Sequence, residues 1–111
     1  MRATQQDFER LQNESQRLAG QLAGMGAIKV ILFGSLARGK ISLFSDIDLL
    51  AIFEDGRTSK ELTGWVYQEL DTGEAVDVLA YSTQSFEKMK ERAFIRHILS
   101  EGKVLYERPE N

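Results

Sequence analysis

The sequence predicts an α/β (α+β) fold in which a small mixed β-sheet of three to four strands is flanked by helices. Short β-branched, apolar runs alternate along the chain with longer segments whose apolar residues recur at three-four spacing. Glycines or capping residues separate these segments. A chain of 111 residues buries roughly two-thirds of its unfolded surface, which is enough for one core. We therefore expect residues 1–111 to form a single domain.

Three long segments are predicted to be helices. One covers 4–23 and begins at Thr4, and another covers 58–73 and begins at Thr58. Each threonine is followed three residues later by an acidic residue, which is typical of a helix start. The third is expected to run without a break through 82–101 and to end at Gly102. Its apolar residues at helical spacing are Phe86, Met89, Phe94, Ile95, Ile98 and Leu99.

The strands are expected between these helices. Residues 27–33, "AIKVILF", are apolar on both faces and indicate a buried strand. Residues 45–53 and 74–81 are predicted as the second and third strands, and 103–107 as a short last one.

Composition excludes several classes of protein. The chain has a formal net charge of −3 and scattered basic residues, so direct binding to nucleic acid is not expected. It contains no cysteine, which excludes disulfides and zinc knuckles. The N-terminus is polar, and no apolar run approaches the ~20 residues of a membrane span. We expect a cytoplasmic protein without a membrane partner.

A glycine-serine pair directly follows the first predicted strand. Glycine at position 34 lets the backbone approach a ligand closely, and the hydroxyl of Ser35 adds a donor for a phosphate oxygen. Arg38, one turn further along, could bind a second phosphate or could pair with an acidic neighbour and brace a short helix. Many turns from strand to helix contain Gly-Ser for geometry alone, so the pair indicates a phosphate site only in combination with other residues.

Three aspartates are predicted to lie on one side of the sheet. Asp46 and Asp48 alternate along the second strand, so their carboxylates face the same way. Asp77 joins them if the third strand neighbours the second. A divalent cation would relieve the repulsion, and hard oxygen ligands favour Mg²⁺ or Mn²⁺; three carboxylates can hold two such ions. Each aspartate alone could instead cap a strand or prevent edge pairing, so the prediction depends on the whole set.

The stretch "GSLARGKISLFSDID" at 34–48 resembles the signature of the DNA polymerase β-like nucleotidyltransferase superfamily, which is Gly-Ser, ten residues, then Asp-x-Asp. Its Ala-Arg-Gly and the serine before the aspartates resemble the short stand-alone branch, the minimal nucleotidyltransferases (MNT). "VDVLAY" at 76–81 is similar to the strand with the third carboxylate, and "HILSEGKVLYE" at 97–107 to the usual C-terminal end. The resemblance covers 28–107 and implies a polymerase β-like nucleotidyltransferase fold.

The resemblance also implies roles for individual residues. Gly34 and Ser35 would hold the triphosphate of ATP, and Arg38 matches a position that is frequent in the family. Asp46 and Asp48 would bind two Mg²⁺ ions, with Mn²⁺ as a substitute. Asp77 would complete the second metal site and, as ligand or general base, help an acceptor hydroxyl to attack the α-phosphorus.

The acceptor implied by the resemblance is a protein. Minimal nucleotidyltransferases are commonly paired with helical HEPN proteins, and act as antitoxins by transferring AMP from ATP to a tyrosine of the HEPN toxin. Two alternatives remain open. The chain could modify a small molecule such as an aminoglycoside, with the site completed by dimerisation, or it could neutralise a HEPN partner by contact alone. The oligomeric state is open as well.

Other residues are assigned to packing. Trp65, Tyr67, Tyr81 and Tyr106 are scattered along the chain, so they are expected in the core or on its flanks, with adenine stacking as a minor alternative. Leu43 and Phe44 stand together in a predicted loop before the aspartates. They could be buried or could contact a partner.

Overall fold

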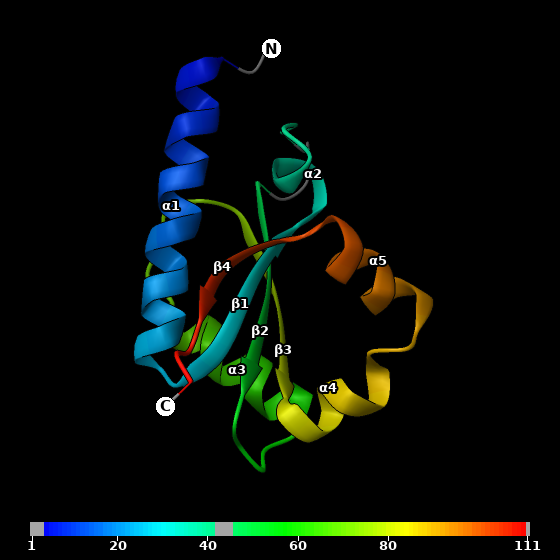
Figure 1. The fold of residues 1–111 in the computed structure, drawn as a ribbon. Coiled ribbons are helices and arrows are strands. Elements are labelled where there is room, and N and C mark those ends of the chain that lie inside the picture. The colour runs from blue at the N-terminus through cyan, green and yellow to red at the C-terminus, as the bar shows by residue number, and fades with distance from the viewer. Residues whose placement is uncertain (1–3, 42–45, 111) are drawn as a thin grey trace.

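A mixed four-stranded sheet forms the centre of the molecule (Figure 1). The computed structural model describes residues 4–41 and 46–110. In order across the sheet, the strands are β3 (Val76–Ser82), β2 (Ile47–Phe53), β1 (Ala27–Phe33) and β4 (Lys103–Glu107). β1 is antiparallel to β2 and β4, whereas β2 and β3 are parallel. The predicted fold class is confirmed.

Helices cover both faces of this sheet. α1 (Gln5–Gly24) and α3 (Ser59–Glu69) pack on one face, α4 (Thr83–Met89) and α5 (Ala93–Glu101) lie on the other, and the one-turn helix α2 (Gly34–Ala37) follows β1 (Figure 1). The larger core lies under α1 and α3, and its helical members include Leu11, Leu18, Leu22, Leu62 and Val66. The smaller core comprises Ile31, Leu50, Tyr81, Ile95 and Ile98. Each buried leucine or isoleucine contributes about 1.5–3 kcal/mol.

The predicted helix starts are confirmed at α1 and α3. The Thr4 hydroxyl accepts from the backbone N–H of Asp7, whose carboxylate accepts from the Thr4 N–H in return. Thr58 and Glu61 form the same reciprocal pair at α3. Each pair satisfies donors that a helix N-terminus otherwise leaves free.

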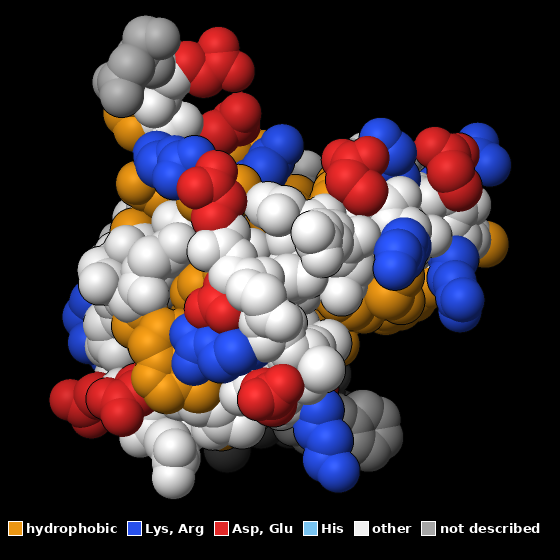
Figure 2. Space-filling view, turned by 90° about the horizontal axis from the view of Figure 1, so that it is seen from below, with side chains coloured by type: hydrophobic (Ala, Val, Ile, Leu, Met, Phe, Trp, Pro, Cys, Tyr) orange, Lys and Arg blue, Asp and Glu red, His pale blue; other side chains and the backbone are white. Residues whose placement is uncertain are grey.

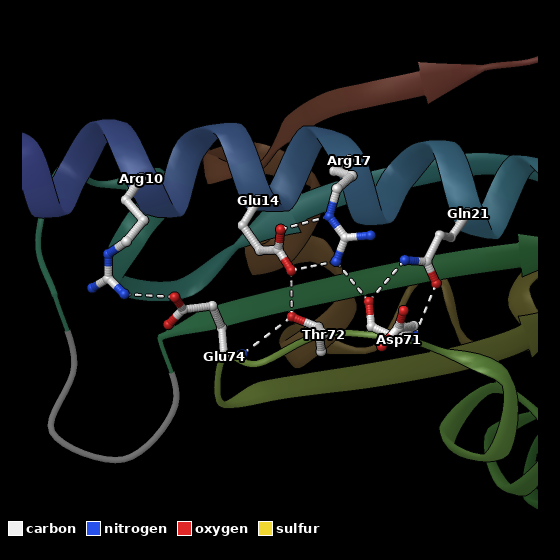
Figure 3. A network of polar contacts seen from close by, with 7 residues as sticks. All are labelled: Arg10, Glu14, Arg17, Gln21, Asp71, Thr72 and Glu74. Atoms are coloured by element: carbon white, nitrogen blue, oxygen red, sulfur yellow. Dashed lines mark hydrogen bonds and ion pairs between the residues drawn. The ribbon is translucent and has the colours of Figure 1, made fainter.

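A polar network ties α1 to the connection between α3 and β3 (Figure 3). The amide of Gln21 pairs with both the backbone C=O and the N–H of Asp71, at 2.8 and 3.0 Å. The guanidinium of Arg17 donates to the same Asp71 carbonyl at 2.6 Å. Arg10 forms an ion pair with Glu74 at 2.5 Å. Because this connection leads directly into β3, the network fixes where that strand begins.

Glu14 is the acidic centre of this network and makes stability dependent on pH. Hydrogen bonds from Arg17 and from the Thr72 hydroxyl outweigh burial and lower the pKa of Glu14 from 4.5 to about 2. This lowered pKa stabilises the fold above pH 4.5, and the contribution is lost as the pH falls from 4.5 towards 2. Arg17 is half exposed, so we expect Glu14→Gln to lose about 1–3 kcal/mol at pH 7.

Urea unfolding at several pH values tests this prediction. The stability difference between wild type and Glu14→Gln should shrink steadily below pH 4.5. Glu9 is an exposed glutamate on the same helix that accepts from the Gln5 amide at 3.3 Å, and Glu9→Gln is the matched control. A constant difference between wild type and Glu14→Gln from pH 7 to 2 would contradict the role given to Glu14.

The predicted single C-terminal helix is wrong, because the structure has two helices there. α4 ends at Met89, and Arg92 is extended, with φ −70° and ψ 143°, before α5 begins. Ile95 stands nine positions after Phe86, which corresponds to a rotation of about 180° in a continuous helix. Only a break allows both side chains to face the same sheet. The break leaves Phe94 58% exposed and Leu99 41% exposed.

The remaining differences are at strand ends. β2 starts at Ile47 and β3 at Val76, two residues later than predicted in each case. The Ala75 carbonyl accepts from the N–H groups of both Asp46 and Ile47, at 3.0 and 3.2 Å, so the strands begin to pair there. The predictions for Leu43 and Phe44 lie outside the described residues.

The surface bears charges of both signs. Figure 2 views the molecule from the end opposite α2, and on this face Lys and Arg side chains are interspersed with Asp and Glu. Within 4–41 and 46–110, none of the helices combines the length and apolar character that crossing a bilayer requires.

Candidate active site

The predicted site residues gather at one end of the sheet, where β1 ends and β2 and β3 begin. Asp48 of β2 is the register partner of Phe33 in β1 and of Asp77 in β3. Register partners on neighbouring strands point their side chains to the same face. The two aspartates therefore share the face that carries α4 and α5. The strand of Asp77 therefore lies next to that of Asp48, as the prediction for Asp77 required.

Gly34 packs directly against one of these carboxylates. Its backbone has φ +72°, a left-handed conformation that favours glycine. A Cβ atom added there would overlap the Oδ2 atom of Asp48 and would lie 3.1 Å from its Cγ. Position 34 therefore requires glycine for two independent reasons. The turn and the aspartate, which are fourteen residues apart in sequence, form one packed unit.

Ser35 and Arg38 lie on the turn after β1. The Ser35 carbonyl accepts from the N–H groups of Arg38 and Lys40, at 3.0 and 2.8 Å, and this closes the single turn of α2. The guanidinium of Arg38 lies 3.5 Å from the carboxylate of Glu101 in α5. Of the two roles predicted for Arg38, the structure therefore shows the pairing with an acidic neighbour. Glu101 also lies 3.2 Å from His97. Phosphate contacts of Ser35 and Arg38 stay predictions.

Asp46 lies just ahead of β2 and is half-buried. Among the described residues, no group of three or more His, Asp or Glu side chains is gathered closely enough to hold a metal ion. Asp48 and Asp77 are register partners on neighbouring strands, whereas Asp46 precedes the first residue of β2. The donors are hard carboxylate oxygens, the chemistry that Mg²⁺ and Mn²⁺ prefer. Asp48 and Asp77 match that preference by their donor atoms, and the binding of Mg²⁺ or Mn²⁺ by the three aspartates stays a prediction.

Tyr67 is a site residue that the sequence analysis assigned to packing. It projects from α3, and its hydroxyl accepts from the backbone N–H of Val78 at 2.7 Å and donates to Oδ1 of Asp77 at 3.4 Å. Tyr81, in contrast, is buried in the smaller core as expected. No sequence signal marks Tyr67, because its contact with Asp77 depends on how α3 crosses the sheet.

The electrostatics of Tyr67 reflect its position. Burial of the hydroxyl raises the pKa of Tyr67, and the negative charges of Asp77 and Asp48 add to this increase, which the Val78 N–H partly offsets. The hydroxyl therefore stays protonated at neutral pH and continues to donate to Asp77.

The arrangement has the features of a nucleotidyltransferase of the polymerase β type: a glycine-serine turn ends the first strand and packs against Asp48 of the second, whose register partner on the third is Asp77. This chain belongs to the polymerase beta, nucleotidyltransferase family, whose sequence profile matches residues 23–111.

Two similar proteins agree with this assignment. The chain is 37% identical over 78 residues to a Methanocaldococcus jannaschii protein named "Putative protein adenylyltransferase", covering 70% of this chain and 77% of that one. A crystal structure described as a "putative nucleotidyltransferase" from Sulfolobus solfataricus superimposes with a TM-score of 0.59 at 19% identity, covering 91% of this chain and 87% of the other. At that identity, the second likeness concerns the fold alone.

Proposed function

We propose that this chain transfers AMP from ATP to a hydroxyl group of a protein. The observation that carries the proposal is the packing of Gly34 against Asp48, with Asp77 beside Asp48 in register. This arrangement puts a tight backbone turn, suited to phosphates, next to two carboxylates suited to a divalent cation. The name of the Methanocaldococcus jannaschii relative supports a protein as the acceptor.

Each residue has a part in this reaction. Gly34 and Ser35 would bind the triphosphate, and Asp46, Asp48 and Asp77 would hold Mg²⁺, which when bound neutralises phosphate charge. Asp77 is the group that would accept the proton of the attacking hydroxyl, because it is exposed and lies on the edge strand β3. The acceptor oxygen bonds to the α-phosphorus, and pyrophosphate leaves.

The acceptor that we favour is a tyrosine of a HEPN partner, which the family resemblance implies. In this role the chain is the antitoxin of a toxin–antitoxin pair and acts in the cytoplasm. Asp77 lies on the open edge of the sheet, and an exposed base is accessible to a side chain presented by a second protein.

Labelled ATP tests this proposal. The chain is incubated with Mg²⁺ and ATP labelled on the α- or the γ-phosphate, with a HEPN protein encoded beside it or with aminoglycosides. We expect α-label on the HEPN protein and γ-label in pyrophosphate. Label on an aminoglycoside alone would replace the protein acceptor with a small molecule. Neutralisation of the toxin without label on any acceptor would show action by contact, and would overturn the proposal.

A further inference from the structure

Tyr67 brings a hydroxyl of this chain to the candidate general base. The Tyr67 side chain is 47% exposed, and its hydroxyl lies 3.4 Å from Oδ1 of Asp77. The Val78 N–H, on the open edge of β3, holds the same oxygen at 2.7 Å. Because that N–H occupies one lone pair of the oxygen, the O–H is directed to Asp77 and the second lone pair stays available.

This geometry is that of a nucleophile beside its base. An activated hydroxyl needs an acceptor for its proton within hydrogen-bond reach, and this distance is often looser before substrate binds. The Tyr67 hydroxyl meets Asp77 at the open edge of the sheet, where the exposed carboxylate is also accessible to an acceptor hydroxyl in the proposed reaction. The other tyrosines are elsewhere: Tyr81 lies in the smaller core, and Tyr106 is half-buried on β4.

We propose that Tyr67 is a self-modification site, which the chain adenylylates with its own ATP. The proposal rests on the proposed function. The Tyr67 oxygen forms a bond to the α-phosphorus of ATP, the bond from that phosphorus to the bridging oxygen breaks, and pyrophosphate leaves with the electron pair. The phenolic proton passes to Asp77. The product is an AMP–tyrosine phosphodiester at the acceptor side of the site.

The modification also changes the site. The esterified oxygen has no proton, so it no longer donates to Asp77. The attached AMP lies on the edge from which a protein acceptor would approach. Self-modified chain should therefore transfer AMP to a partner more slowly than unmodified chain does.

Mapping on the unsubstituted chain tests this inference. The full chain is incubated alone with Mg²⁺ and α-labelled ATP and then cleaved after glutamate. Glu69 and Glu74 lie between Tyr67 and Tyr81, so this cleavage separates the two tyrosines. We expect the added AMP on the peptide that contains Tyr67. Tyr67→Phe should lose the label, and the matched control Tyr106→Phe should keep it.

The outcomes separate this inference from the proposed function. Label on a HEPN acceptor in a parallel reaction, with Tyr67 unmodified, would overturn self-modification and leave the transferase activity standing. Label on the chain at any other residue would also overturn the assignment to Tyr67. If neither the chain nor any acceptor gains label, both proposals fail.

Discussion

Replacing Asp77 with asparagine is expected to lower AMP transfer about 1000-fold without weakening the fold. The substitution removes the carboxylate that we assign to proton transfer and to the cation. The side chain is exposed, and asparagine keeps an oxygen that can accept from the Tyr67 hydroxyl. Asp77 and Asp48 are register partners, and like charges in that position destabilise a sheet by about 0.2–1 kcal/mol. The free energy of unfolding should therefore stay constant or rise by that amount.

Two measurements check this prediction. Initial rates with α-labelled ATP give the loss of transfer, and urea unfolding gives the change in stability. Asp71→Asn is the matched control, because it removes the same charge six residues away while the contacts to α1 involve the backbone of Asp71. Transfer by Asp77→Asn within tenfold of wild type would remove Asp77 from the chemistry. A marked loss of stability would mean that Asp77 serves the fold.

The fold could be predicted largely because its determinants are local. The Thr4 and Thr58 caps need only neighbouring residues, and β1 follows from a continuous apolar run. The break between α4 and α5 could not be predicted in this way. It depends on which parts of the sheet Phe86 and Ile95 must cover, and that is a tertiary requirement which helical spacing alone does not contain.

Only part of the arrangement of the candidate site residues could be predicted from the sequence. Strand alternation predicts a common face for Asp46 and Asp48, but Asp46 precedes the first residue of β2. The pairing of Asp48 with Asp77 requires β3 to lie parallel and next to β2. The contact of Tyr67 with Asp77 could not be predicted, because it depends on how α3 packs against β3. The contact of Arg38 with Glu101 likewise depends on the late return of the chain through α5.

Replacing Gly34 with alanine should lower AMP transfer about 100-fold and also weaken the fold. An L-residue at φ +72° costs roughly 1–2 kcal/mol. The new methyl group would also overlap Oδ2 of Asp48, so the carboxylate must turn away or the turn must shift. A displacement of about 1 Å in a catalytic group can cost 100-fold in rate. Transfer rates and urea unfolding of the purified variant measure the two effects.

Gly39→Ala separates these two causes within the same turn. Gly39 has φ +78°, close to that of Gly34, but a Cβ atom there would meet no atom of residues 4–41 and 46–110 within 4 Å. Both variants should therefore lose similar stability from backbone strain, and only Gly34→Ala should also lose transfer. Equal losses of transfer would attribute the defect to strain in the turn. A selective loss in Gly34→Ala would mean that glycine at position 34 keeps the Asp48 carboxylate in place, because the overlap with that carboxylate is what distinguishes the two positions.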